Sequence, residues 1–500
     1  MNPYLAANFA PISTEHTVAD LPVTGTIPEH LDGRYLRNGP NPIGEIDPRT
    51  YNWFLGDGMV HGIRIRDGKA EWYRNRWVRN RPVADTLGER RRGRTTTGMD
   101  LATNTNVIGH AGKTFALVEG GAPVFELTDD LESVGPCDFD GTLPGAYTAH
   151  PQRDPLTGEL HAVSYYFGWG NRVQYTVLDR DARVRRAVDI EVSGSPMMHN
   201  FSLTENHVLL YDLPVTFDTG IAATTSVPRF LRGAARLTLS ALIGNVRIPD
   251  PMAAAASRRL RPNAPLPYSW NPRYPARIGV LPRDGRSRDV RWFDVDPCYV
   301  FHPVNAYEDG NTIVVEVPRY DRVFDQDRHG PGDAPPLLER WEIDLAAGKV
   351  RTERIDDIMQ EFPRIDERLL GHRHRYAYTS AAREEGWFDS VVKHDVEQST
   401  STVHTFGEGT EVGEFVFVPA AADAAEDEGV LMGFVYDKAS DRSDLTLLDA
   451  ATLEHVASIH LPTRVPAGFH GNWVPTAGSL PAGQREAHAG RRVGDHHRPE

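Results

Sequence analysis

Four histidines stand in sequence contexts that suit metal ligation, and together they define the chemistry that this chain could perform. They are His150 in TAHP, His199 in MMHNF, His302 in FHPVN and His470 in GFHGNW. A set of imidazoles without cysteine or carboxylate ligands suits a redox-active first-row metal, and iron above all. The four contexts therefore predict an all-imidazole site, and iron is the ion that we expect there.

The spacing of these histidines requires a large closed fold. The steps between them are 49, 103 and 168 residues, which no single helix or loop can span. Each histidine lies beside Pro, Gly or Asn and close to a short strand-like segment. Strand ends that point at a common axis would therefore bring the four rings together.

Short apolar, β-branched runs separated by Gly, Pro, Asn and Asp recur along the whole chain and predict an all-β protein. The runs are residues 114–118, 161–167, 173–178, 207–213, 312–317, 414–418 and 430–436. Residues 340–354 and 445–461 each predict two strands joined by a turn, at 346–349 and 449–452. A chain of 500 residues is long for one sandwich or barrel, so we expect a single β-propeller domain over residues 1–475.

One segment departs from this pattern and predicts a helix. It reads PRFLRGAARLTLSALI at residues 228–243, with Ser226 as a possible cap. On a helix Arg229, Arg232 and Arg236 share one face, and the opposite arc holds Phe230, Leu231, Ala234, Leu237, Ala241 and Leu242. Two interpretations remain open. The helix from Arg229 to Ile243 either packs on the sheet as a surface helix or touches a membrane or guards an apolar tunnel mouth.

Composition narrows the class of protein. The net charge of -15 argues against nucleic-acid binding, which needs a cationic surface. Only two cysteines are present, so neither a disulfide framework nor a thiolate zinc site is expected. We see no secretory signal and no apolar run of membrane-spanning length, which predicts a soluble, cytoplasmic chain. Residues 476–500 are polar and rich in Gly, Arg and His, and we expect a disordered tail there.

The histidine motifs resemble those of the carotenoid cleavage oxygenases, the family that also contains the retinal pigment epithelium isomerohydrolase and the lignostilbene dioxygenases. The resemblance covers about residues 20–475 and keeps the family's order. It includes GRYLRNGPNP at residues 33–42, FLGDGMVHG at 54–62 and NTNV at 104–107. It implies a seven-bladed β-propeller with a helical or loop dome over the metal-bearing face. It also implies Fe(II) on the propeller axis, with His150, His199, His302 and His470 as its ligands.

The same resemblance implies three glutamates that accept hydrogen bonds from three of the imidazoles. The matching positions are Glu119 in LVEGG, Glu361 in EFPRID and Glu414 in GEFVF. A carboxylate on the far nitrogen fixes the tautomer and orientation of an imidazole and raises its basicity. Taken singly, each glutamate could instead be a solvated acid at a strand end. His61, which follows a GDG turn, competes as a ligand, but the family assigns its segment to the scaffold.

The resemblance implies an oxygenase that uses O2 to cleave a C=C bond into two carbonyl products. Lignostilbene cleavers carry a lysine close to the first of the three glutamates, whereas Val118 precedes Glu119 here. An apolar residue cannot pair with a phenolate, so we expect a carotenoid or apocarotenoid held in a nonpolar tunnel. A stilbene-cleaving or other phenylpropanoid-cleaving dioxygenase and a catalytically silent lipid-binding propeller remain as alternatives.

Overall fold

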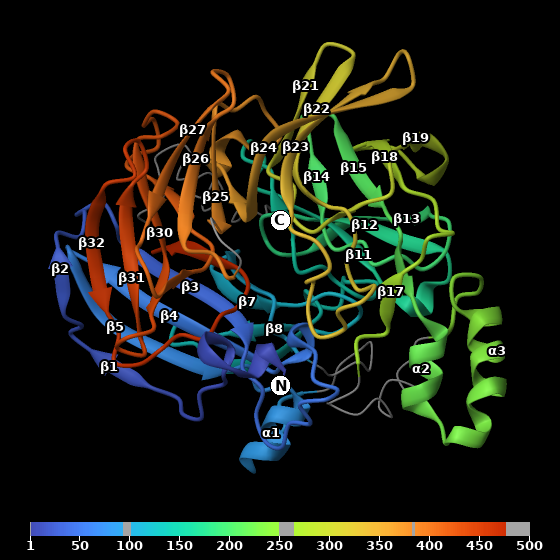
Figure 1. Cartoon of the computed structure of the whole chain (residues 1–500), viewed down its shortest axis with the longest axis horizontal. Helices are drawn as coiled ribbons and strands as arrows, with labels where there is room; N and C mark the ends of the chain where they lie inside the picture. Colours follow the sequence, from blue (N-terminus) through green and yellow to red (C-terminus); the bar gives the residue numbers. More distant parts are fainter. Residues whose placement is uncertain (1, 94–101, 250–264, 383–385, 477–500) are drawn as a thin grey trace, which may run out of the picture.

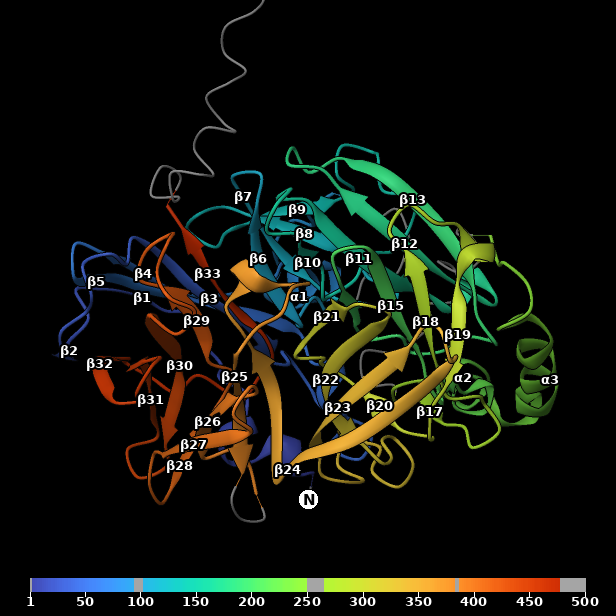
Figure 2. The same ribbon diagram turned by 90° about the horizontal axis from the view of Figure 1, so that it is seen from above.

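The named strands form antiparallel sheets that follow one another in chain order around the molecule (Figures 1 and 2). The computed structural model describes residues 2–93, 102–249, 265–382 and 386–476. In Figure 2 the colours run around a ring from blue through green and yellow to orange, and the red end returns beside the blue start. The seven predicted strand runs and both predicted strand–turn–strand segments are confirmed.

Six sheets of four or more strands make up this ring. The first is β1 (Thr17–Ala19), β5 (Lys69–Trp77), β4 (Gly58–Arg66), β3 (Gly33–Pro40) and β33 (Gly471–Pro475). The second is β6 (Asn106–His110), β7 (Lys113–Leu117), β8 (Val124–Leu127) and β9 (Ser133–Cys137). The third is β10 (Gln152–Arg153), β11 (Leu160–Tyr165), β12 (Arg172–Leu178) and β13 (Val184–Glu191). The fourth is β14 (Phe201–Leu203), β15 (His207–Asp212), β18 (Arg277–Pro282) and β19 (Arg291–Asp294).

The remaining two large sheets complete the ring. The fifth is β20 (Tyr299–Val300), β22 (Thr312–Tyr320), β23 (Leu337–Asp344), β24 (Lys349–Arg364), β25 (Tyr376–Ala382), β26 (Ser390–Asp395) and β27 (Thr400–Thr405), with β21 (Asn305–Asp309) paired to β22. The sixth is β2 (Val23–Gly25), β32 (His455–His460), β31 (Arg442–Asp449), β30 (Gly429–Asp437) and β28 (Thr410–Val412), with β29 (Val416–Pro419) paired to β30. A small seventh sheet pairs β16 (Val215–Phe217) with β17 (Tyr268–Trp270).

Strands from both ends of the chain close the ring. β33 pairs with β3 from Gly33 opposite Pro475 to Arg37 opposite Gly471. The early strand β2 likewise pairs with β32 of the sixth sheet. These pairings cover the edges of β3 and β32 and tie late residues to early ones. The pairing of β33 also fixes the position of His470, which directly precedes that strand.

The predicted all-β propeller is confirmed, whereas the number of blades stays a prediction. The fifth sheet holds eight strands because the 16-residue β24 joins β23 through its first part and β25 through its last part. If the sheet is divided at β24, the large sheets would count as seven blades.

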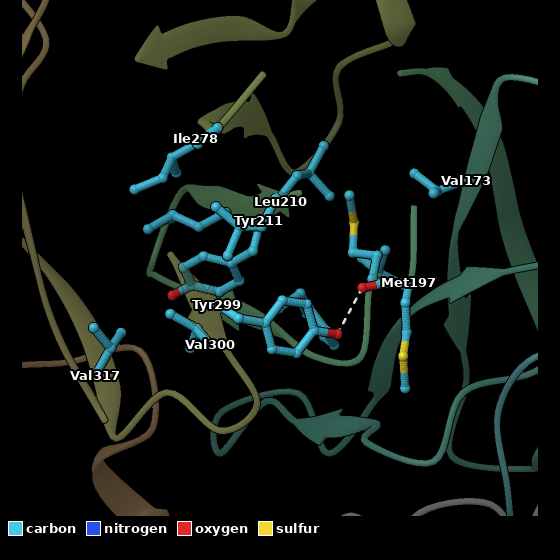
Figure 3. Close-up of a cluster of buried hydrophobic side chains, with 14 of the residues drawn as sticks. Val173, Met197, Leu210, Tyr211, Ile278, Tyr299, Val300 and Val317 are labelled. Atoms are coloured by element: carbon cyan, nitrogen blue, oxygen red, sulfur yellow. Dashed lines mark hydrogen bonds between the residues drawn. The ribbon is translucent and has the colours of Figure 1, made fainter. Parts of the chain in front are cut away.

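The largest apolar core lies among the third, fourth and fifth sheets and anchors two of the predicted ligands (Figure 3). Members labelled in the figure are Val173, Met197, Leu210, Tyr211, Ile278, Tyr299, Val300 and Val317. The Tyr299 hydroxyl donates a hydrogen bond of 2.8 Å to the Met197 carbonyl. Because Met197 precedes His199 by two residues and Tyr299 precedes His302 by three, this bond ties the two histidine segments together.

In the part of the chain that the structure describes, helices are few and short. The α-helices are α1 (Arg81–Leu87), α2 (Thr219–Ser226) and α3 (Arg232–Leu242). The 3-10 turns are η1 (Pro3–Leu5), η2 (Ala7–Phe9), η3 (Trp53–Leu55), η4 (Phe167–Trp169), η5 (Arg229–Leu231), η6 (Ser287–Asp289) and η7 (Glu367–Leu369). α2 and α3 form a pair between β16 and β17, at one side of the molecule in Figure 1.

The predicted helix is present, but its cap and its first residue differ from the prediction. Ser226 does not cap it, because Ser226 is the last residue of the separate helix α2, and α3 begins at Arg232 after the turn η5. The helix packs against α2, and its apolar arc faces outward. Phe230 is 83% exposed and Leu237 is 75% exposed.

Two further predictions concern the C-terminal tail and membrane-spanning segments. The predicted tail at residues 476–500 lies outside the described residues, apart from Thr476. Among the described residues, no helix has the length and apolar character that crossing a bilayer requires.

Candidate metal centre

The four predicted histidines converge on one point of the ring, as the strand-end setting predicted. Each stands one to three residues before the edge strand of a sheet: His150 before β10, His199 before β14, His302 before β21 and His470 before β33. A backbone that is about to enter a sheet edge is still free of the ladder, so its side chain can point away from the sheet. Four different sheet positions thus supply one imidazole each.

The geometry of the four rings is that of a ligand set. One ligand nitrogen from each ring lies within 4.8 Å of the other three. The Nε2 atoms of His199 and His302 are 3.1 Å apart. His150 is 7% exposed, and its Nε2 is buried without a hydrogen-bond partner. His61, the competing candidate, lies in β4 with its Nδ1 2.9 Å from the Tyr73 hydroxyl, outside this group.

Three glutamates occupy the far sides of three rings. The Nδ1 atom of His199 is 2.8 Å from Glu119, that of His302 is 2.7 Å from Glu361, and that of His470 is 3.0 Å from Glu414. All three glutamates were singled out from sequence, and the structure pairs each with one histidine. In the described part of the chain no carboxylate pairs with His150.

These contacts decide which nitrogen carries the proton. A carboxylate is an acceptor, so Nδ1 of His302 donates to Glu361, and Nε2 of that ring is left with a lone pair. The 2.8 Å contact between Nδ1 of His199 and Glu119 favours the same tautomer for His199. Two lone pairs that face each other at 3.1 Å repel unless a Lewis acid lies between them. The buried, unpartnered Nε2 of His150 has the same need. The donor set therefore fits a metal ion.

Burial lowers the pKa of three of the imidazoles, those of His150, His302 and His470, which favours the neutral form that metal ligation requires. Desolvation lowers the pKa of His302 to about 4, although Glu361 opposes the shift. Desolvation and the neighbouring imidazoles hold the pKa of His150 well below its ordinary value. Burial would raise the pKa of Glu414, but the charge of Arg364 and the hydrogen bonds from Arg364 and His470 outweigh it and hold that pKa well below its usual range.

Further hydrogen bonds, from one side chain and two backbone N–H groups, hold the three carboxylates in turn. The Tyr165 hydroxyl donates to Glu119 at 2.9 Å, and the backbone N–H of Gly471 donates to Glu414 at 2.8 Å. The backbone N–H of Phe362 donates to Glu361. Phe362 has a φ of 53°, a left-handed conformation that costs a non-glycine residue about 1–3 kcal/mol.

Aromatic side chains surround the imidazoles. Phe301 meets His199 edge-on at 5.2 Å, and Phe362 stacks on His302 at 5.6 Å. Phe54 of η3 lies nearly parallel to both Phe301, at 5.9 Å, and Phe469, at 5.5 Å. We call Phe54, Phe301 and Phe469 the aromatic wall. The sequence analysis did not predict it, although a phenylalanine directly precedes both His302 and His470. The expected nonpolar tunnel stays a prediction.

Comparison with known proteins places the chain among oxygenases. The family described as retinal pigment epithelial membrane protein matches residues 9–475. A protein of Mycobacterium tuberculosis named carotenoid cleavage oxygenase is 57% identical, over 95% of this chain and 98% of its own. A carotenoid 9,10(9',10')-cleavage dioxygenase of Arabidopsis thaliana is 30% identical, over 94% and 89%. The solved structure of a Pseudomonas brassicacearum lignostilbene dioxygenase superposes with a TM-score of 0.78 at 25% identity, over 95% and 98%.

Proposed function

The chain belongs to the carotenoid cleavage oxygenase family, and from that premise we propose that it is an Fe(II)-dependent dioxygenase that cleaves a C=C bond of a carotenoid or apocarotenoid. The products are two carbonyl compounds, and O2 is the co-substrate. One observation carries the proposal: four imidazoles converge, and three of them are backed by carboxylates.

The residues divide the work between holding a metal and shaping its surroundings. His150, His199, His302 and His470 would hold Fe(II), which, when bound, supplies the redox chemistry that activates dioxygen. Glu119, Glu361 and Glu414 keep the Nδ1 protons of three rings in place and make those rings stronger donors.

The aromatic wall supports an apolar substrate. Phe54, Phe301 and Phe469 present ring faces and edges but no hydrogen-bonding group. Such a surface excludes water from the reacting atoms and accepts a polyene by contact alone. The name of the relative at 57% identity, a carotenoid cleavage oxygenase, supports the same substrate class.

The test is the identity of the products. Purified, iron-loaded protein is given β-carotene or apocarotenals under labelled dioxygen, and the aldehydes are trapped at once and analysed by mass. The proposal expects two carbonyl fragments whose masses locate one cleaved double bond, with one labelled oxygen in each. Intact polyenes together with cleavage of hydroxystilbenes would instead favour the phenylpropanoid alternative. Intact substrates of both kinds would favour a silent lipid-binding propeller.

Val118 is expected to favour a polyene over a phenol. It is 7% exposed and stands between the end of β7 and Glu119. A V118K variant would bury an ammonium beside an apolar substrate, which is unfavourable without a partner. We expect its kcat/KM for the polyene to fall at least about tenfold, and hydroxystilbene cleavage to rise. The conservative V118L variant is the control, and unchanged polyene cleavage by V118K would contradict this role.

We also propose that the protein is cytoplasmic and that its α3 region docks on a membrane surface. Carotenoids reside in bilayers, and the exposed apolar residues gather on η5 and α3: Phe230, Leu231, Leu237 and Leu242. Arg229 and Arg236 lie on the same elements and can meet lipid phosphates.

Replacing Phe230, Leu237 and Leu242 together by aspartate is expected to abolish binding to liposomes. Each lost apolar side chain removes about 1 kcal/mol or more of burial, and each added charge opposes insertion. Flotation with phosphatidylcholine–phosphatidylglycerol vesicles measures the effect. L156D is the matched control, because Leu156 is 72% exposed in a turn between β10 and β11. Equal flotation of the triple variant and the unaltered protein would rule out this docking site.

A further inference from the structure

Strand β24 contains one extra residue beside the metal centre. Glu361 pairs with Ser380 of β25, and Arg364 pairs with Tyr378. Three steps along β24 therefore oppose two steps along β25, which is a β-bulge. Ser380 and Tyr378 are two residues apart and share a face of their strand. Glu361 and Arg364 consequently share a face as well, whereas in a regular strand residues three apart would point to opposite faces.

This arrangement lets one short segment reach two of the four histidines. Glu361 contacts the His302 ring at 2.7 Å, and Arg364 reaches the carboxylate behind His470. Between them, Phe362 stacks on His302 and meets His470 edge-on at 5.5 Å. Its left-handed φ is the conformation that the bulge imposes.

The Arg364 guanidinium closes a ring of hydrogen bonds around His470. Its Nε donates to Glu414 Oε1 at 2.9 Å and its Nη2 to Glu414 Oε2 at 3.1 Å. Nη2 also donates to the carbonyl of Gly471. Glu414 accepts in turn from the His470 ring and from the Gly471 N–H. Both the ring and the following peptide of His470 are therefore held by the same pair of charged groups.

The three carboxylates differ in this respect. Of these three carboxylates, only Glu414 is paired with a cationic side chain other than histidine among the described residues. Glu119 accepts from a tyrosine hydroxyl, and Glu361 accepts from a backbone N–H. The pair is well buried: the side chain of Arg364 is 15% exposed and that of Glu414 is 3% exposed. A bidentate guanidinium–carboxylate pair adds directional restraint that a single hydrogen bond lacks.

We propose that Arg364 is a positioning residue for His470: its guanidinium locks Glu414 and the Gly471 carbonyl in one arrangement and so aims the imidazole at the metal position before metal binds. The proposal rests on the proposed function, because it concerns the same metal centre. The bulge places Glu361 and Arg364 on the face of β24 that looks toward His302 and His470.

Cobalt(II) affinity of the metal-free protein tests this role. Competition with a chromophoric chelator gives the dissociation constant, and the visible spectrum of bound cobalt reports the ligand field. R364M is expected to weaken cobalt binding at least about tenfold and to alter the spectrum. R364K is expected to recover part of the affinity, since lysine keeps the charge but lacks the two-pronged donor. R368M is the matched control, because Arg368 pairs with Asp366 on the same segment and has no contact with the centre.

A double-substitution series separates positioning from general structure. In an E414Q background, R364M is expected to cost little further affinity, because its partner is already lost. In an E119Q background it is expected to keep its full cost, since Glu119 supports His199 from another sheet. Thermal unfolding of each variant confirms that affinity is measured on folded protein.

Two results would overturn the inference while leaving the metal centre intact: equal cobalt affinity and spectrum for folded R364M and the unaltered protein, or full additivity of R364M with E414Q. Absence of cobalt binding by the unaltered protein would overturn the proposed metal centre and this inference together.

Discussion

Replacement of His302 by alanine is expected to abolish stoichiometric iron binding and to lower the rate of polyene cleavage at least about 1,000-fold, since metal catalysis supplies several kcal/mol and each 1.36 kcal/mol is a factor of ten. The Nε2 atoms of His302 and His199 are 3.1 Å apart. Its loss also leaves the buried carboxylate of Glu361 without its imidazole partner. Metal analysis and product formation measure the two effects.

The control for this substitution is H455A. His455 is an exposed residue at the start of β32 and lies outside the four-histidine group. The variant is expected to keep both its iron and its activity. Iron bound by H302A at one ion per chain, with unchanged turnover, would remove His302 from the ligand set.

Replacement of Glu361 by glutamine is expected to lower iron affinity about 10- to 100-fold, the usual cost of losing a partner of a ligating histidine. The shape of the site permits the exchange. A single oxygen of Glu361, Oε2, accepts from both His302 and the Phe362 N–H, and an amide oxygen can keep both bonds. What is lost is the negative charge that makes the His302 imidazole a stronger donor. Competition with an Fe(II) chelator under anaerobic conditions gives the change in affinity.

E353Q provides the comparison for this exchange. Glu353 lies on the same strand, β24, with its side chain 61% exposed, and pairs with Arg351 rather than with a histidine. We expect its iron affinity to stay within about twofold of the unaltered protein, because exposed ion pairs contribute little. Equal affinities for E361Q and E353Q would show that the carboxylate behind His302 does not tune the centre.

The strands could be predicted from sequence because their signals are local. In residues 445–461 two apolar runs flank a turn, and the structure forms β31 and β32 there. The α2–α3 pair shows where local reasoning fails. Asp218 caps α2 by accepting from the N–H groups of Gly220 and Ile221. An aspartate at this position is a helix-capping signal in the sequence, but the sequence analysis did not predict α2. Amphipathicity revealed two faces of α3 but could not decide which face the protein covers.

The site was predictable only in part, for a physical reason. His150 and His470, 320 positions apart in the sequence, meet through the closure of the ring, so no local pattern reveals their contact, and the family motifs supplied the set. Arg364 was visible in the motif EFPRID, but its role was not. The parity of a regular strand would send it away from Glu361, and only the bulge in β24 reverses that direction.

The most direct test of the central claim is a titration of metal-free protein with Fe(II) under anaerobic conditions, followed by O2 and an apocarotenal. The four-histidine centre predicts that product formation rises linearly with added iron and stops rising at one Fe(II) per chain. Equal turnover by the metal-free protein, or no cleavage at full iron loading, would contradict it.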